Sequence, residues 1–198
     1  MGRPLPPPRD EGSLLSWQRP DGPASRGGCS RATASLRLCL VALALGAGLP
    51  SAAQQSYPLL GAAAPNFALR AANGGNVRLS EHRGEVVVLS FWSSRCYPCR
   101  AQLVALSRSL ATYRSAGLAV YGIGVDDDPV QSQDFAHSVA VEFALLLDPT
   151  KVVSRSYQVD NLPMTVLIDR NGTVRYVLRD YSAASSALYL QQLRALLN

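Results

Sequence analysis

Apolar residues beyond residue 85 alternate between two spacings, one typical of strands and one typical of helices. Residues 86–91 form an almost unbroken apolar run, which predicts a central strand covered on both faces. From about Cys99 to Ser115, apolar residues recur every three or four positions, which predicts a helix that ends near Gly117. The alternation then continues, predicting strands at 118–125, 143–147, 164–169 and 173–178, and helices from 126, over 151–157 and from about 183.

Two turn sequences predict hairpins. Asn73-Gly74-Gly75 separates 67–70 from 77–79, which indicates a short N-terminal β-hairpin. Arg170-Asn171-Gly172 joins the last two strands, and Asn-Gly is the strongest short hairpin signal. Strands that alternate with helices and end in a hairpin plus a helix predict an α/β sandwich.

The first 53 residues have a different character. Residues 1–30 are rich in Pro, Gly, Ser and Arg without periodicity, which predicts a disordered leader extension. A basic flank at Arg31 and Arg37, the apolar run 38–49 and small residues at Ser51 and Ala53 then predict a signal peptide over 31–53, cleaved after Ala53. The apolar run is shorter than the roughly 20 residues that span a bilayer. An uncleaved N-terminal membrane anchor is the alternative, and 54–198 is the expected folded domain.

Charge and cysteine content limit the classes of function that this chain can have. Of the net charge of +5, the leader carries six Arg against three acids, and residues 54–198 carry twelve Arg and one Lys against eleven acids. Without a basic stripe in the folded part, no nucleic-acid partner is expected. Cys29 and Cys39 fall in the leader, so the mature chain keeps only Cys96 and Cys99. A single close pair in an exported protein indicates redox chemistry rather than a disulfide scaffold.

The candidate catalytic residues are Cys96 and Cys99, in Cys96-Tyr97-Pro98-Cys99 at the junction of the central strand and the following helix. Unpaired backbone N–H groups and the helix dipole stabilise a thiolate at Cys96 there, and Arg95 and Arg100 add positive charge. Residues three apart in a helix face the same side, so the two sulfurs lie within disulfide range. We expect Cys96 to attack a partner disulfide and Cys99 to resolve the mixed disulfide.

A second candidate element precedes the strand at 164–169. Asn161-Leu162-Pro163 ends in an X–Pro bond, which adopts the cis form at modest cost. If Pro163 is cis beside Cys96, the backbone of Leu162 can pair with an extended substrate peptide. Trp92 and Tyr97 are candidate substrate-contacting aromatics, although Trp92 is equally explained by packing.

Over residues 61–197 the chain resembles the TlpA/ResA-type, membrane-facing branch of the thioredoxin superfamily. The resemblance implies a thioredoxin-like fold with a central mixed β-sheet flanked by helices, a cis Pro163 and a redox-active Cys96–Cys99 disulfide with no further cofactor. It also implies a periplasmic or other extracytoplasmic protein that reduces apo-cytochrome c, copper-site thiols or other client disulfides, supplied by a membrane or extracytoplasmic electron donor. The matching segments are 61–67, 91–92, 96–100, 120–126, 148–149, 162–165 and 167–172.

Three positions depart from that resemblance, and a fourth differs from cytoplasmic thioredoxins. Arg95 stands where Trp is common, and Val104 where Pro is common. Gln102 replaces a Glu that manages protons near the buried thiol, and Ser90 stands where cytoplasmic thioredoxins have a buried Asp. Disulfide exchange is still expected, but protons of Cys99 must move through water or another group. The specialised cytochrome role is therefore less strongly implied, and Arg95 is a candidate for tuning the thiolate or an ordinary surface charge.

Other polar residues have plainer interpretations. Asp126–Asp128 are better explained by helix capping than by cation binding, because Pro129 follows them at the start of a helix. His82 and His137 are isolated from other ligand types, so they are expected to be surface residues. One cysteine pair lacks the further ligands of a closed zinc site, and no metal is expected.

Two other functions remain open. A thiol peroxidase of the peroxiredoxin type needs Pro and Thr just ahead of its cysteine, and Ser93-Ser94-Arg95 supplies neither. A thioredoxin-like binding module needs no redox pair, so the intact Cys96–Cys99 pair and Pro163 argue against it.

Overall fold

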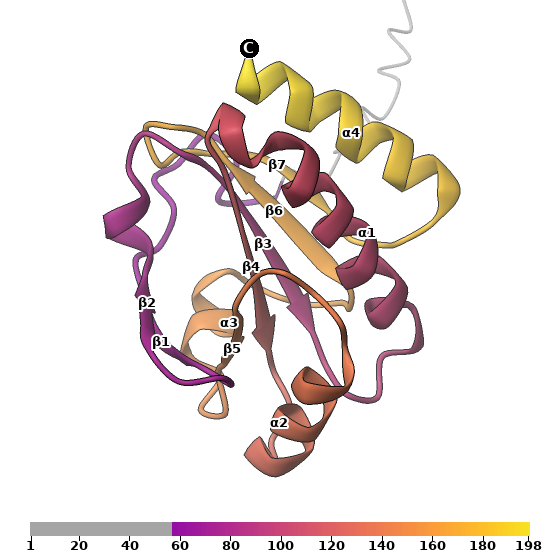
Figure 1. The fold of residues 1–198 in the computed structure, drawn as a ribbon. Coiled ribbons are helices and arrows are strands. Elements are labelled where there is room, and N and C mark those ends of the chain that lie inside the picture. The colour runs from indigo at the N-terminus through magenta and orange to yellow at the C-terminus, as the bar shows by residue number, and fades with distance from the viewer. Residues whose placement is uncertain (1–56) are drawn as a thin grey trace, which may run out of the picture. The chain divides into compact units, whose positions relative to one another are not determined.

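A seven-stranded mixed sheet forms the centre of the described part of the chain, residues 57–198 of a computed structural model (Figure 1). The expected leader, residues 1–30 and 31–53, lies outside the described residues. The strand order is β2-β1-β5-β4-β3-β6-β7. The strands are β1 (Ala68–Ala71), β2 (Asn76–Arg78), β3 (Val86–Trp92), β4 (Leu118–Gly124), β5 (Leu145–Leu147), β6 (Met164–Ile168) and β7 (Val174–Leu178).

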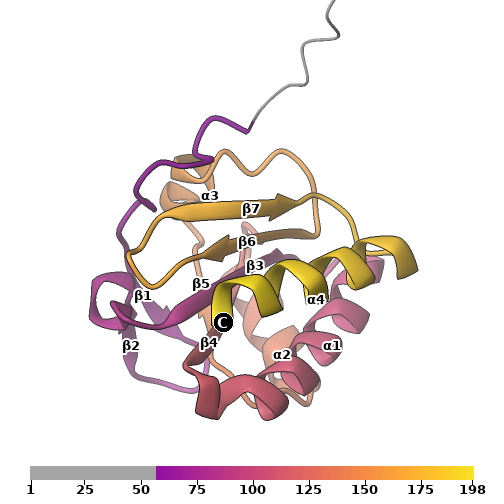
Figure 2. The same cartoon turned by 90° about the horizontal axis from the view of Figure 1, so that it is seen from above.

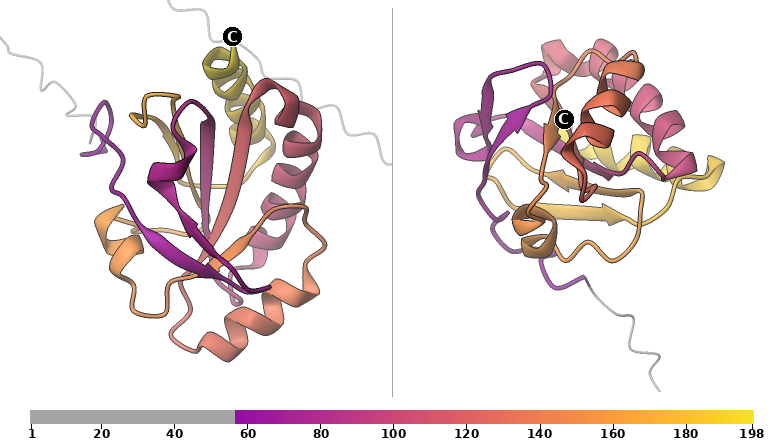
Figure 3. Two further views of the ribbon diagram at one scale, coloured as in Figure 1. Left: turned by 60° about the vertical axis from the view of Figure 1, so that its left-hand side comes forward. Right: turned by 90° about the horizontal axis from the view of Figure 1, so that it is seen from below.

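Helices cover both faces of this sheet. They are α1 (Tyr97–Tyr113), α2 (Pro129–Ser138), α3 (Val152–Ser156) and α4 (Ala183–Leu197), with 3-10 turns η1 (Leu79–His82) and η2 (Arg114–Ala116). Figures 2 and 3 show α1 and α4 side by side on one face and α3 on the other, with α2 beside α1. The expected central sheet flanked by helices is confirmed.

The central strand explains this layering. All seven residues of β3 are buried, because it pairs in parallel with β4 and antiparallel with β6 and is covered on both faces. Its alternate side chains enter different cores. Leu89 and Phe91 pack in the core that contains Tyr157 at the end of α3. Val86 and Val88 pack in the core formed with α1 and α4.

Both expected hairpins are present. β1 and β2 pair antiparallel across the turn that contains Gly74 and Gly75, which both have positive φ. β6 and β7 pair antiparallel across a turn in which Asp169 Oδ1 accepts backbone N–H groups of Asn171 and Thr173, each at 2.9 Å.

The helix that carries the cysteines begins two residues earlier than predicted, at Tyr97. Cys96 is its N-cap, and Pro98 lies in the first turn, where a missing N–H costs no helical hydrogen bond. Strand β5 is shorter than predicted, because its ladder with β4 begins at the pair Gly122 and Leu145. Between residues 57 and 198, no helix has the length and apolar character needed to cross a membrane.

Candidate redox site

The two candidate cysteines lie where β3 leads into α1. Cys96 and Cys99 are joined by a disulfide, with their Cα atoms 5.4 Å apart. Cys96 is partly exposed, whereas Cys99 is completely buried against Trp92 and Leu103. The predicted proximity of the two sulfurs is confirmed, and only Cys96 is within reach of a reagent in solvent.

The loop before Cys96 is held by a carboxylate from the neighbouring strand connection. Asp126 accepts the Ser94 backbone N–H at 2.9 and 3.1 Å through its two oxygens, and the Ser94 hydroxyl at 3.0 Å. The Ser132 hydroxyl of α2 donates to the same carboxylate at 2.7 Å. Asp126 therefore fixes the loop that presents Cys96 and ties it to α2.

The expectation that the whole Asp126–Asp128 run caps a helix is correct for only one of the three residues. Asp128 is the N-cap of α2 and accepts the Val130 N–H at 2.9 Å. Asp127 instead pairs with Lys151 at 2.5 Å, and this hydrogen bond is the main reason that its pKa is lowered. Because a helix has a single N-cap, the other two carboxylates have other partners: Asp126 binds Ser94 and Ser132, and Asp127 binds Lys151.

An open groove of about 530 Å³ lies beside Cys96. Its walls come from the loop before α1 and the first turn of that helix on one side, and from α3 and residues 159–162 on the other. Leu162 lines this groove, and the Leu162–Pro163 peptide bond is cis, as predicted. Pro163 itself is buried. Asn161 and Leu162 thus meet Cys96, more than 60 residues away in the chain, at one groove.

The two candidate aromatic residues differ in exposure. Tyr97 is 97% exposed and lies between the two cysteines in the chain, so it is available to a partner protein. Trp92 is completely buried and stacks on Phe135 of α2, with ring centroids 4.8 Å apart. Of the two interpretations of Trp92, this burial and stacking favour packing over direct contact with a substrate.

The two arginines that flank the cysteines also differ. Arg100 donates to the carbonyl and hydroxyl oxygens of Ser138 at 3.0 and 2.7 Å, and its guanidinium lies over the Phe135 ring. Its charge is therefore directed to the end of α2. Arg95 is exposed and lines the groove together with Cys96. Of the two arginines, Arg95 is therefore the one whose charge lies beside the exposed cysteine.

A buried polar network lies one helical turn beyond Cys99. The Ser90 hydroxyl donates to Gln102 Oε1 at 3.0 Å, and Gln102 Nε2 donates to Thr165 Oγ1 at 2.6 Å. All three side chains are at most 5% exposed. Ser90, expected to be a small core residue, is thus also a hydrogen-bond donor, and the network contains no titratable carboxylate.

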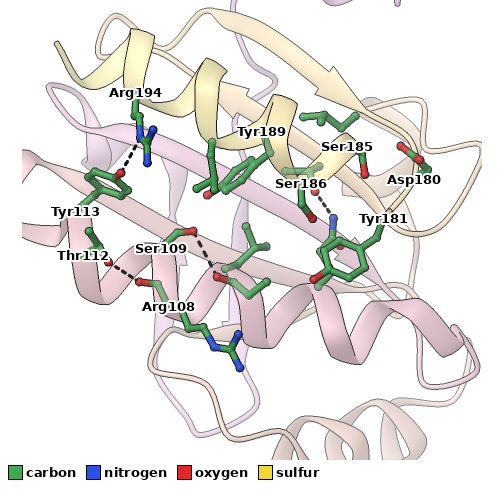
Figure 4. A pocket seen from close by; sticks show the side chains of 16 residues that line it. Arg108, Ser109, Thr112, Tyr113, Asp180, Tyr181, Ser185, Ser186, Tyr189 and Arg194 are labelled. Carbon is green, nitrogen blue, oxygen red and sulfur yellow. Dashed lines mark hydrogen bonds between the residues drawn. The ribbon is translucent and has the colours of Figure 1, made fainter. Parts of the chain in front are cut away.

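A second pocket, of about 380 Å³, lies between α1 and α4 and was not predicted (Figure 4). Gln102 and Thr165 line it together with Tyr189, which reaches from α4 toward α1. The Tyr189 hydroxyl is buried without a hydrogen-bond partner among the described residues, and burial raises its pKa. Ser109 lies near enough to lower that pKa in turn, but its own hydroxyl donates to the Ala105 carbonyl at 3.3 Å.

The histidines lie apart from the redox pair. His82 is half-buried, with Nδ1 2.7 Å from Glu85 and Nε2 2.8 Å from the Tyr121 hydroxyl, so it is not the plain surface residue expected. Burial raises the pKa of Tyr121 to about 12. His137 is exposed, as expected. Across residues 57–198, no group of three His, Cys, Asp or Glu is arranged to hold a metal ion.

A Cys-x-x-Cys disulfide on the first turn of a helix that follows the central strand places the molecule in the thioredoxin-like class. The chain belongs to the AhpC/TSA family, which residues 60–177 match. It is 31% identical over 119 residues to the thiol-disulfide oxidoreductase ResA of Geobacillus kaustophilus, an alignment that covers 60% of this chain and 68% of that protein.

Solved structures show the same relationship. A Chlorobium tepidum protein described as the thiol:disulfide interchange protein DsbE matches with a TM-score of 0.67 at 34% identity, covering 70% of this chain and 98% of that one. A secreted Mycobacterium tuberculosis disulfide oxidoreductase matches with a TM-score of 0.57 at 25% identity, covering 66% and 96% of the two chains. The thioredoxin-like fold and the class of thiol-disulfide oxidoreductases are both confirmed.

Proposed function

We propose that this protein reduces disulfides of exported client proteins through a dithiol–disulfide cycle of Cys96 and Cys99. The observation that carries the proposal is the difference in exposure between the two joined cysteines, since Cys96 opens to the groove and Cys99 is completely buried. In such a pair, a client sulfur can reach Cys96, and Cys99 lies close enough to Cys96 to resolve the mixed disulfide that forms. ResA-type relatives, named thiol-disulfide oxidoreductases, support the same reaction.

The reduced protein starts the cycle with a thiolate at Cys96. It attacks one sulfur of the client disulfide, forms a mixed disulfide and releases the other client sulfur as a thiolate, which takes a proton from solvent. The Cys99 thiolate then attacks the Cys96 sulfur and expels the second client thiol. The client gains two electrons, the Cys96–Cys99 disulfide forms, and a dithiol donor outside the cytoplasm must reduce it again.

The position of Cys96 favours its thiolate form. It caps the N-terminus of the 17-residue helix α1, where free N–H groups and the helix dipole stabilise negative charge. Arg95 adds a fixed positive charge at the adjacent position. Both effects make Cys96 the better leaving group and the faster nucleophile of the pair at neutral pH.

The client chain is proposed to dock beside Leu162. The groove places this residue opposite the first turn of α1, with the apolar side chains of Pro98, Val125 and Val159 in the same walls. An extended peptide can add its backbone hydrogen bonds at such an edge while its cysteine meets Cys96. Tyr97, at the exposed end of α1, is proposed as a further contact for the client.

The proton of Cys99 needs a route that differs from a buried carboxylate. Gln102 and Ser90 are neutral, and their hydrogen bonds are already used within their network. We therefore propose that solvent entering the groove, once Cys96 has opened toward a client, carries this proton.

An extracytoplasmic location, with residues 31–53 as a signal peptide or membrane anchor, is part of the same proposal. It rests on the basic flank, apolar run and small residues of that segment. The secreted Mycobacterium tuberculosis relative agrees with it. Protein exported by a bacterial host should begin at Gln54, and N-terminal sequencing checks this. Retention of residues 38–49 in the membrane fraction would instead indicate an anchor.

Reduction of insulin disulfides by the purified protein, with dithiothreitol as electron source, tests the activity. The protein should accelerate reduction over dithiothreitol alone, and both Cys96→Ser and Cys99→Ser should lose turnover. Only Cys99→Ser, which keeps the attacking thiol, should accumulate a mixed disulfide with insulin. No acceleration by the unaltered protein would support a binding module instead, and rapid consumption of peroxide would support a thiol peroxidase.

A further inference from the structure

The groove beside Cys96 is lined by two arginines that come from different parts of the chain. Arg95 precedes Cys96 in the β3–α1 loop, and Arg155 comes from α3, so they reach the groove from different elements. Both are exposed. Within residues 57–198 neither side chain forms an ion pair or a hydrogen bond.

The carboxylates around the groove, by contrast, all have partners. Asp160 lines the groove and pairs with Arg179 at 3.3 Å. Asp127 pairs with Lys151, the third cation of the groove. Asp126 and Asp128 accept hydrogen bonds from neutral backbone groups of the loop before Cys96 and of the N-terminus of α2, and neither residue lines the groove. The groove lining therefore holds three cations, Arg95, Lys151 and Arg155, against the one carboxylate of Asp160, so its formal charge is positive.

We infer that this groove prefers client segments that carry acidic side chains beside the cysteine to be reduced. The inference rests on the proposed function and specifies its substrate class. A guanidinium presents a planar set of N–H donors that matches a carboxylate, which makes Arg a selective partner for Asp and Glu. Charges around a cleft also steer the approach of oppositely charged ligands, so the effect should appear in the association rate.

Short peptides that differ only in charge test the inference. Each carries one cysteine joined by a disulfide to mercaptoethanol, with Glu, Gln or Lys on both sides of it. Reduced full-length protein, freed of dithiothreitol, is mixed with each peptide, and release of the peptide thiol is followed in a single turnover. In each turnover one peptide disulfide becomes two thiols while the Cys96–Cys99 dithiol becomes a disulfide.

The Glu peptide should react fastest and the Lys peptide slowest. Because one exposed charge pair changes an equilibrium by about two- to fivefold, two arginines together should give a rate ratio of about tenfold. Arg155→Glu should lower the Glu-to-Lys ratio at least about threefold. Using the ratio removes any change in the reactivity of Cys96, since both peptides meet the same thiolate.

Arg108→Glu is the matched control. Arg108 is an exposed arginine of α1 without an ion pair in the described part of the chain, and it lies twelve residues after Cys96. At 1.5 Å per residue the two positions are about 18 Å apart, beyond the screening length of about 8 Å at physiological salt. Its substitution should leave the ratio unchanged, and raising the salt from about 0.05 M to about 0.5 M should reduce the ratio for the unaltered protein.

The outcomes separate the inference from the proposed function. Equal rates for all three peptides, or an equal loss of ratio in Arg155→Glu and Arg108→Glu, would overturn the acidic preference while leaving the reductase activity in place. Failure to reduce any peptide, including the neutral Gln peptide, would overturn the proposed function itself.

Discussion

Placing a carboxylate in the buried network next to Cys99 should make the stability of this protein depend on pH. Gln102→Glu changes one atom group at a side chain that is 5% exposed and is held between the Ser90 and Thr165 hydroxyls. Ser90 can still donate to the new carboxylate, and Thr165 can turn its hydroxyl to do so. Burial nevertheless penalises the charged form and raises the pKa of a carboxyl.

The magnitude follows from the burial and the two remaining donors. Full burial raises the pKa of a carboxyl by up to about 3–5 units, and two hydroxyl donors offset part of this rise. We therefore expect the folded-state pKa of the new carboxyl to lie about two units above its unfolded-state pKa of about 4.3. A folded pKa above the unfolded one means that stability is retained below pH about 4.3 and lost as pH rises through the folded value. The loss should be about 1 kcal/mol at pH 5 and about 2.7 kcal/mol at pH 8.

Urea unfolding of the oxidised protein at several pH values from 4 to 8 measures this loss. The free energy of unfolding of Gln102→Glu is subtracted from that of the unaltered protein at each pH, which cancels all other titrating groups. Gln191→Glu on the exposed side of α4 is the control and should give a difference near zero throughout. A loss for Gln102→Glu that stays constant from pH 4 to pH 8, or no loss, would refute the buried network.

Three further predictions concern packing, buried hydroxyls and the redox pair. Gly124→Ala should lower the free energy of unfolding, measured by denaturant titration, by about 1–3 kcal/mol, because the added Cβ would lie 2.7 Å from the Trp92 ring. Combining it with Trp92→Leu should make the destabilisation by Gly124→Ala smaller. Tyr189→Phe should leave the melting temperature unchanged or higher, because its hydroxyl has no partner in the described structure. Tyr157→Phe, which removes a 2.8 Å hydrogen bond to a backbone carbonyl, should lower the free energy of unfolding by about 1 kcal/mol. A destabilised Tyr189→Phe together with an unchanged Tyr157→Phe would contradict the assignment. Arg95→Trp should lower the reduction potential by up to about 20 mV in glutathione equilibration, because the lost charge no longer favours the thiolate; an unchanged or higher potential would mean that Arg95 does not tune the pair.

The features that follow from local sequence were predictable. The apolar run of β3, the Asn-Gly turn and the cysteine spacing each depend on residues that are close together in the chain, and they identified the central strand, the last hairpin and the disulfide. The X–Pro element at 161–163 could be placed at the same site only through the resemblance to known proteins.

The features that depend on strand register were not predictable. Asp126 meets Ser94 across 32 residues, and Gln102 meets Thr165 across 63, because β3, β4 and β6 are neighbours in the sheet. Nothing in the local pattern distinguishes Asp126 from Asp128, or shows that Trp92 faces inward opposite Gly124. The pocket between α1 and α4 likewise joins segments about 80 residues apart.

The hydrogen bonds of Asp126 to the loop before Cys96 have a consequence for protein engineering. Residues 93–99 do not fold as an independent cassette, because their shape is set by a carboxylate supplied after β4 and shared with a serine of α2. Transplanting the Cys-x-x-Cys sequence into another scaffold would therefore transfer the two cysteines without the carboxylate that fixes the conformation of the loop before them. A graft that keeps the geometry needs Asp126 and Ser132 as well, supplied after a second strand that pairs in parallel with the strand before the cysteines.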